Sequence, residues 1–143
     1  MMAKTASAKA PRLALVVHSD VGVLSSFQSA LTEKGFVTIV ARDLPTALLA
    51  MTQHYFEVAV VSSRLGEGGD GWPLAGVLHL VFPKAFVAVI SPDEPDVLVL
   101  QAAINYGARE VFDLSRPAAE VVGSILAQLE IAGNRAASKS SVQ

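Results

Sequence analysis

Short runs of apolar residues alternate along the chain with longer segments in which apolar residues recur every three or four positions. The runs lack alternating polar positions, which is typical of parallel β-strands that are buried on both faces. We expect strands at residues 12–18, 36–41, 56–62, 85–91 and 109–113. The longer segments begin near an Asp or a Pro and predict helices at residues 20–34, 43–54, 73–81, 95–107 and 117–130.

This alternation predicts one α/β domain that is built from consecutive β-α units. With right-handed crossovers, five such units form a doubly wound, five-stranded parallel sheet flanked by five helices, and the common strand order is 2-1-3-4-5. We place the folded domain at residues 11–131. Residues 1–10 and 132–143 are small, polar or rich in Ala, Ser and Lys, so we expect disordered tails there.

The overall composition fits one globular domain and excludes several classes of function. Of the 143 residues, 52% are hydrophobic, which is enough for one core. Eleven Lys and Arg against 13 Asp and Glu provide no basic surface for nucleic acid or for a membrane. The absence of cysteine excludes disulfides and thiolate chemistry. The chain shows neither an apolar run of about 20 residues nor a secretory signal, so we expect a cytoplasmic protein.

Polar residues stand where the predicted strands end. His18, Ser19 and Asp20 follow the first strand, Ser62 ends the third strand, and Ser91 ends the fourth. In a sheet of order 2-1-3-4-5 the first and third strands are neighbours, and ligands bind at the carboxyl ends of such strands. We therefore expect these side chains to line one pocket.

Over residues 12–130 the chain resembles the receiver domain of bacterial response regulators. The likeness rests on the order of the elements and on short matches at strand ends. These matches are Val16-Val17 followed by Asp20, then Asp70-Gly71, Ser91 at the family's Thr/Ser position, and Gly107-Ala108 before the fifth strand. The resemblance implies the receiver, or flavodoxin-like, fold and a role in two-component signal transduction or a phosphorelay.

The groups that carry phosphorylation in that family are replaced in this chain. The family's paired acids fall on His18 and Ser19, and its phosphoacceptor aspartate falls on Ser62. Its Lys-Pro falls on Leu114-Ser115 by direct counting, or on Arg116-Pro117 with an insertion, and the lysine is absent in either case. Receiver phosphorylation needs a carboxylate nucleophile and a Mg²⁺ ion with oxygen ligands, which imidazole and hydroxyl groups replace poorly. We therefore expect no phosphorylation, no metal site, no cofactor and no enzymatic activity.

Two interpretations of the strand-end residues remain open. In the first, the pocket is an inert, neutral cluster joined by hydrogen bonds, which avoids the repulsion of clustered carboxylates. Its members would be His18, Ser19, Ser62, Ser63 and Ser91.

In the second, the chain is a small-ligand-binding or weakly catalytic flavodoxin-like domain. Its pocket would lie around His18, Ser62 and the loop from Gly66 to Gly71, which has the G-x-G-x-x-G spacing of dinucleotide sites. This loop follows the third predicted strand instead of the first, and no G-x-S-x-G motif surrounds Ser62, so the sequence favours the inert cluster.

The fourth predicted helix points to a protein interaction. Apolar residues occur on nearly all sides of this helix, so it has more of them than one buried face requires. If Leu100, Ala103 and Ile104 face the sheet, the interaction face is formed by Leu98, Ala102, Asn105, Tyr106 and the nearby Val111. Receivers use this region, formed by the fourth helix, fifth strand and fifth helix, for protein contacts. The leading hypothesis is a phosphorylation-independent pseudo-receiver that binds a protein partner or forms a homodimer.

Overall fold

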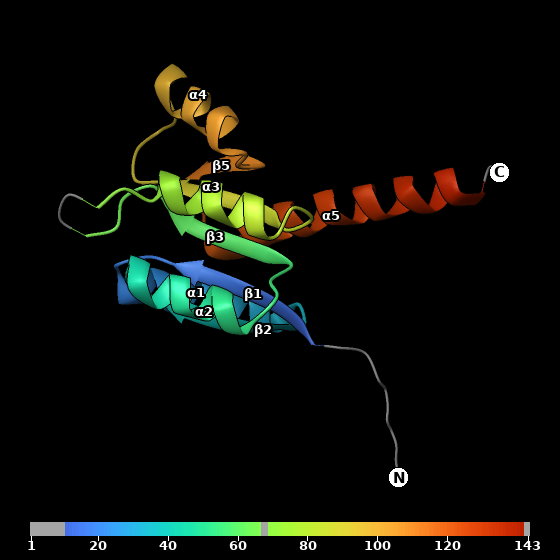
Figure 1. Cartoon of the computed structure of the whole chain (residues 1–143), viewed down its shortest axis with the longest axis horizontal. Coiled ribbons are helices and arrows are strands. Elements are labelled where there is room, and N and C mark those ends of the chain that lie inside the picture. Colours follow the sequence, from blue (N-terminus) through green and yellow to red (C-terminus); the bar gives the residue numbers. More distant parts are fainter. Residues whose placement is uncertain (1–10, 67–68, 142–143) are drawn as a thin grey trace, which may run out of the picture.

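The computed structural model describes residues 11–66 and 69–141, in which five strands and five helices alternate (Figure 1). The strands are β1 (Arg12–Val17), β2 (Phe36–Ala41), β3 (Val58–Ser62), β4 (Phe86–Ser91) and β5 (Glu110–Asp113). The helices are α1 (Val21–Glu33), α2 (Leu44–Gln53), α3 (Trp72–Val81), α4 (Val97–Tyr106) and α5 (Ala118–Ser141). The predicted α/β class is confirmed. The tail predicted at residues 1–10 lies outside the described residues.

The strands form one parallel sheet in the order β2-β1-β3-β4-β5, which confirms the predicted topology. Every residue of β3 and β4 is buried, because each of these strands has a neighbour on both sides and helices on both faces. Val17 pairs with Val61, and Ser62 pairs with Ile90. The carboxyl ends of β1, β3 and β4 therefore lie side by side.

Two layers of helices cover the sheet (Figure 1). On one face, α1 and α5 bury side chains such as Phe27 and Ile125. On the other face, α2 and α3 bury side chains such as Met51 and Leu78. At the β5 edge, α4 contacts α3 and β5, and it buries only Ala103. It therefore buries fewer residues than any of the other four helices.

Three helices begin at an aspartate that the sequence analysis places near the helix start. In each case the carboxylate accepts a hydrogen bond from a backbone N–H three residues later, which caps the helix. The bonds run from Val23 to Asp20 (3.1 Å), from Thr46 to Asp43 (2.9 Å) and from Val99 to Asp96 (2.9 Å). At the other end of α4, Gly107 adopts a left-handed conformation with φ of +76° and ends the helix.

The last helix is longer than the sequence analysis predicts. The predicted end near Glu130 is wrong, because α5 continues to Ser141 through most of the tail expected to be disordered at residues 132–143. Residues 132–141 contain Ala, Arg and Lys and no proline, so the local preference for helix persists after the apolar pattern has ended. Neither this helix nor any other in the described part of the chain combines the length and the hydropathy needed to span a bilayer.

Candidate functional site

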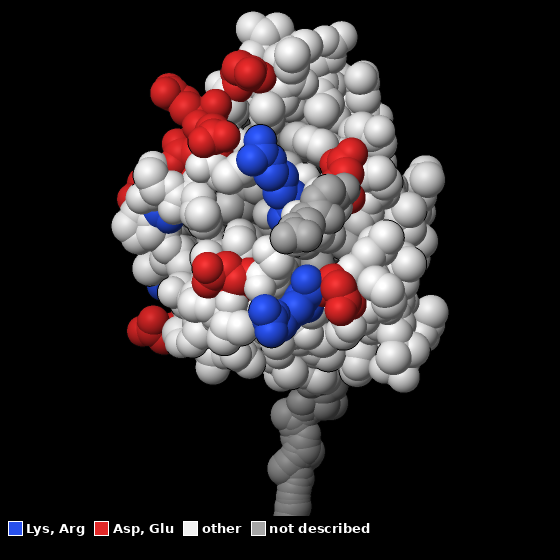
Figure 2. All heavy atoms as spheres, turned by 90° about the vertical axis from the view of Figure 1, so that its left-hand side faces the viewer, with Lys and Arg blue, Asp and Glu red and all other residues white. Residues whose placement is uncertain are grey.

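The carboxyl ends of the strands lie at the end of the molecule that faces the viewer in Figure 2. Ser62 ends β3 and Ser91 ends β4, and their side chains are buried, with exposed fractions of 4% and 3%. His18 follows β1 and is half-buried, whereas Leu114 follows β5 and is exposed. The fold thus places all four residues at one end of the sheet.

The hydroxyl of Ser62 is held by its own loop. It donates a hydrogen bond to the carbonyl oxygen of Arg64 (2.6 Å) and accepts one from the Arg64 backbone N–H (3.2 Å). These two bonds close a tight turn at the end of β3. The proton that a general base would have to remove is bonded to a carbonyl, so the geometry is unsuited to nucleophilic attack by Ser62.

His18 contacts the backbone at the start of α1. Its Nδ1 accepts a hydrogen bond from the Asp20 backbone N–H (3.0 Å), which requires that nitrogen to be unprotonated. Burial lowers the pKa of His18, and the nearby carboxylate of Asp20 opposes this shift. Beside it, Arg42 donates two hydrogen bonds to the Ser19 carbonyl oxygen, at 3.3 Å and 3.1 Å. His18 is therefore a neutral residue that fixes the turn between β1 and α1.

The expected hydrogen bonds among the strand-end side chains are not formed in the described part of the chain. The hydroxyl of Ser62 bonds to Arg64, and the imidazole of His18 bonds to Asp20. Backbone bonds hold the remaining segments, from Ser63 N–H to the Ile90 carbonyl oxygen among others. The side chains of His18 and Ser62 thus bond within their own loops, so the strand-end residues share a place in the fold without forming one side-chain network.

Two separate hollows open at this end instead of one pocket. The first, of about 410 Å³, lies between the β3–α3 and β4–α4 loops, and its lining includes Ser63, Arg64, Asp70, Ser91, Asp93 and Glu94. The second, of about 470 Å³, lies between α1 and the β5–α5 loop, and its lining includes Asp20, Gly22, Phe27, Leu114 and Arg116. His18 and Ser62 line neither hollow, so the predicted pocket is divided between two places.

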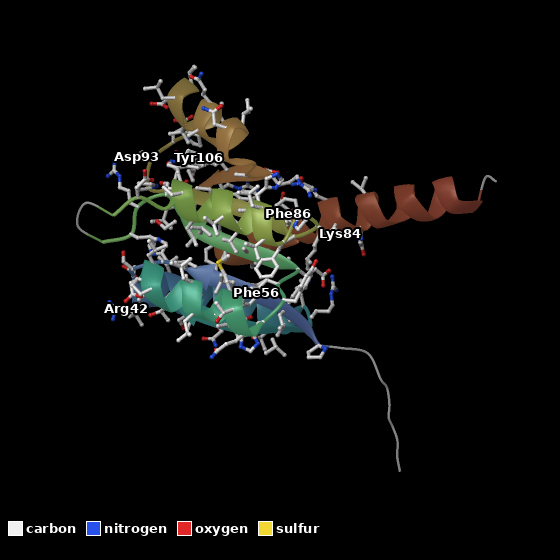
Figure 3. The ribbon with its side chains drawn as sticks, viewed as in Figure 1. Arg42, Phe56, Lys84, Phe86, Asp93 and Tyr106 are labelled. Atoms are coloured by element: carbon white, nitrogen blue, oxygen red, sulfur yellow. The ribbon has the colours of Figure 1, made fainter. Side chains whose placement is uncertain are left out.

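Charges of both signs surround these hollows (Figure 2), and several of the carboxylates start helices. The Asp70 carboxylate accepts a hydrogen bond from the Trp72 backbone N–H (3.0 Å) at the start of α3, and Asp96 caps α4. Asp93 lies at the same end of the molecule as Arg42 (Figure 3). In the part of the chain that the structure describes, no three His, Asp or Glu side chains are arranged to hold a metal ion.

The glycine-rich loop folds back closely on β3. A Cβ added at Gly71 would lie 1.8 Å from the Ser62 carbonyl oxygen, and one added at Gly69 would lie 1.8 Å from the Leu65 carbonyl oxygen. The Gly71 N–H also donates to the Ser63 carbonyl oxygen (3.0 Å). These glycines allow close approach of two backbone segments. Of the glycines that make up the G-x-G-x-x-G spacing, Gly71 therefore has a structural explanation, and Gly69 falls on a variable position of that spacing.

The fourth helix exposes more apolar surface than the sequence analysis predicts. Leu98 is exposed by 74%, in agreement with its place in the expected interaction face. The prediction that Leu100 and Ile104 face the sheet is wrong, because they are exposed by 51% and 81%. Ala102 is partly buried, Asn105 and Tyr106 are exposed, and Val111 is partly buried against the core under α3. The periodicity failed here because the helix is apolar all round and offers no polar face to orient it.

The two flanks of α4 differ in what they contact. On one flank the Tyr106 ring stacks on the Trp72 ring of α3, with 6.2 Å between the ring centroids. The opposite flank, which points away from α3, carries apolar side chains at positions i, i+3 and i+7. We call this set the α4 stripe, and it consists of Val97, Leu100 and Ile104, exposed by 77%, 51% and 81%.

Comparison with known proteins supports the fold alone. No protein-family model and no curated protein matches this sequence. A CheY-like receiver domain protein from Methanospirillum hungatei JF-1 has a TM-score of 0.77 at 17% identity, over 88% of this chain and 99% of that chain. A response regulator from Burkholderia pseudomallei, solved with a phosphorylated aspartic acid and a calcium ion, has a TM-score of 0.72 at 19% identity, over 86% and 74% of the two chains.

An orphan response regulator of H. pylori, HP1043, is similar to the chain as well. Its TM-score is 0.70 at 18% identity, over 82% of this chain and 96% of that chain. These structures share the strand order and the five flanking helices expected for a receiver domain. The chain therefore has the receiver fold of two-component response regulators, as the sequence resemblance implies.

Proposed function

We propose that this chain is a phosphorylation-independent protein-interaction module of bacterial two-component signalling, located in the cytoplasm and without enzymatic activity. The observation that carries the proposal is the environment of Ser62. The resemblance places the phosphoacceptor aspartate at this position, at the end of β3, and here a serine hydroxyl is bonded to the Arg64 carbonyl oxygen at 2.6 Å. This residue supplies neither a carboxylate for an acyl phosphate nor a charged oxygen for Mg²⁺.

The neighbouring positions support the same conclusion. His18 and Ser19 stand where the family has paired acids, and the pKa of His18 is lowered by burial, so the imidazole is neutral at physiological pH. Leu114 stands where the family has its lysine, and an apolar side chain cannot pair with a phosphoryl oxygen. All three changes remove charges that phosphoryl transfer would use.

The α4 stripe supports the interaction role. Its three side chains expose apolar surface on α4, the helix that contacts β5 and that belongs to the region that the resemblance implies for protein contacts. Interfaces between proteins are apolar and poor in charge at their centres. A protein partner that covers Val97, Leu100 and Ile104 would remove this surface from water.

Small-ligand binding is the second candidate function. The first hollow, at about 410 Å³, falls within the usual size of small-molecule pockets, and the buried Ser91 lines it. Against it, two of the carboxylates that line the hollow, Asp70 and Asp96, already accept backbone N–H bonds at the starts of helices.

The test is an amide NMR titration of the ¹⁵N-labelled chain with Mg²⁺ and then with beryllofluoride, which receivers bind at their aspartate. We expect no saturable shifts at Ser62, Ser91 or Val111. A conventional receiver domain with its aspartate intact serves as the positive control under identical conditions.

Saturable shifts at Ser62 that spread to α4 would overturn the proposal, because the site would then respond to a phosphoryl mimic. Shifts confined to the first hollow, around Ser63, Asp70 and Ser91, would favour the small-ligand candidate. A Ser91→Ala variant then distinguishes binding in the hollow from a general effect of ionic strength. Shifts caused by binding should change in this variant, whereas shifts caused by ionic strength should not.

A further inference from the structure

A large uncharged surface covers the side of the sheet opposite α1 and α5. Helices α2, α3 and α4 have ten residues each, and their sequences contain no Lys, Arg, Asp or Glu. In Figure 1 α2 and α3 both cover this side of the sheet, and in Figure 2 the corresponding flank, toward the right, carries no red or blue. Surface helices usually carry charged residues on their outer face.

The outer positions of α2 and α3 are occupied by aliphatic side chains. On α3 the inward positions are Leu74, Ala75 and Leu78, so the helix is apolar on both faces. The exposed members are Leu44, Leu48 and Leu49 on α2, and Val77, Leu80 and Val81 on α3, with Leu80 exposed by 79% and Leu49 by 58%. We call these six residues the α2–α3 face. It is distinct from the α4 stripe, which lies on the far flank of α4.

A concave feature adjoins this face. A hollow of about 350 Å³ lies between α3 and α4, and its lining includes Gly76, Val77, His79, Leu80 and Tyr106. Leu80 protrudes beside the hollow, so the surface has both an apolar projection and an apolar depression. Such a surface is suited to receive a projection like its own.

We infer that the α2–α3 face is the interface of a symmetric dimer of this chain, with α3 packed against α3 of the second copy. In a twofold interface the same patch meets itself, so a charged residue near the axis would face an identical charge. The absence of charge from three adjacent helices removes this conflict. The same absence argues against a membrane, because helices that bind anionic lipid do so with Lys and Arg.

The size of the surface is of the order that a dimer needs. Two helices of ten residues are each about 15 Å long and about 10 Å wide, which gives a flat footprint of roughly 300 Å². The accessible area exceeds the flat footprint because the side chains protrude. A standard interface buries about 800 Å² per partner, which is of the same order. This dimer leaves the α4 stripe free for the partner of the proposed function.

The test is sedimentation equilibrium of the full chain over a roughly hundred-fold range of concentration, with Leu80→Glu as the main variant. We expect the wild type to dimerise and Leu80→Glu to weaken the dimer by about 100-fold or more, because a carboxylate is then buried in each copy. Leu80 is exposed by 79%, so the variant should fold, which its circular dichroism and amide spectrum check.

Two controls and one rescue make the test specific. Ser29→Glu on α1 and Ile104→Glu on the α4 stripe are exposed substitutions of the same charge that should leave the dimer intact. A mixture of Leu80→Glu with Leu80→Lys should associate where neither variant does alone, because the two α3 helices then carry opposite charges.

A wild type that stays monomeric over the whole range would overturn the inference. A dimer that resists Leu80→Glu, or that Ile104→Glu dissociates instead, would also overturn it, by placing the interface on the α4 stripe. Flotation of the wild type with neutral phosphatidylcholine vesicles, without dimerisation, would assign the face to lipid. None of these results depends on the Mg²⁺ and beryllofluoride titration, so the two proposals fail separately.

Discussion

The two helical layers have equally complete cores and very different outer surfaces. Among the residues whose side chains are described, each face of the sheet has a cluster of sixteen buried residues, so the interior gives both layers the same kind of support. On α1 the exposed positions are mainly Ser, Gln, Thr and Glu, whereas on α2 and α3 they include Leu and Val. The fold therefore accounts for the inward residues of both layers, and the dimer inferred above would account for the outward residues of α2 and α3.

The largest expected effect is the difference in lost stability when a buried and an exposed leucine of the same helix are each replaced. Leu78 is fully buried and Leu80 is exposed by 79%, both on α3. We expect Leu78→Ala to lower the free energy of unfolding by about 2–5 kcal/mol, because it leaves a cavity in the core. Leu80→Ala in dilute protein should change it by less than about 0.5 kcal/mol.

Urea unfolding of both variants at low concentration measures this difference. Equal losses would show that Leu80 is packed within the monomer, which would remove the contrast between the two faces. At high concentration Leu80→Ala should become destabilising as well, since it then weakens a dimer that stabilises the folded state.

A smaller difference in stability is expected between two glycine-to-alanine substitutions, one in each helical layer. A Cβ added at Gly123 in α5 meets nothing within 4 Å, so Gly123→Ala should stabilise the protein by about 0.5–1 kcal/mol through helix propensity. A Cβ added at Gly76 in α3 would lie 3.0 Å from the Tyr106 ring, so Gly76→Ala should lose this gain.

Thermal unfolding of the two glycine variants, with and without Tyr106→Ala, measures the coupling. If the contact between α3 and α4 causes the difference, removal of the ring restores the benefit of alanine at position 76 but not at position 123. A stabilising Gly76→Ala in the presence of the ring would show that α4 moves aside at little cost.

The smallest effect concerns pH and lies outside both layers, at His18. Burial lowers the pKa of His18 in the folded chain, so the unfolded chain binds a proton more readily. The contribution of His18 to the free energy of unfolding is fully present above its ordinary pKa of 6.5. It is lost as the pH falls through 6.5 toward the lower pKa of the folded chain. Hydrogen bonds from Thr46 and Ser115 lower the pKa of Asp43 and Asp113, whose contributions are lost only below about their ordinary 3.8.

Urea midpoints measured between about pH 7.5 and about pH 5 test this sign. His18→Asn keeps a hydrogen-bond acceptor for the Asp20 N–H and removes the titration, so the variant should lose less stability on acidification than the wild type. Asp43→Asn is the matched control, and it should follow the wild type in this window. An unchanged slope in His18→Asn would contradict the assignment.

Most of the fold could be predicted from local signals. Unbroken apolar runs identified the buried strands, and capping residues such as Asp20, Asp43 and Gly107 marked the ends of helices. The end of α5 could not be found in the same way, because residues after Glu130 lose the apolar pattern but keep helix-forming side chains. The inward face of α4 could not be predicted either, because a helix without a polar face shows no alternation of apolar and polar positions.

The candidate site was predictable in position but not in detail. The strand order brought His18, Ser62 and Ser91 to one end of the sheet, as expected. Their hydrogen bonds were not predictable, because a serine at a strand end can bond to a neighbour across the sheet or to its own turn, and the sequence does not distinguish the two. The outward leucines of α2 and α3 did carry a signal that was missed, which is the lack of any charge in both helices.

The turn at Ser62 also bears on how the chain could change by substitution. The hydroxyl both donates to and accepts from the backbone of Arg64, and an ionised aspartate can only accept. Replacing Ser62 with aspartate would therefore leave the Arg64 carbonyl oxygen without its donor. An aspartate at this position would lose one of the two hydrogen bonds that close the turn after β3, so its carboxylate would be introduced at the expense of that turn.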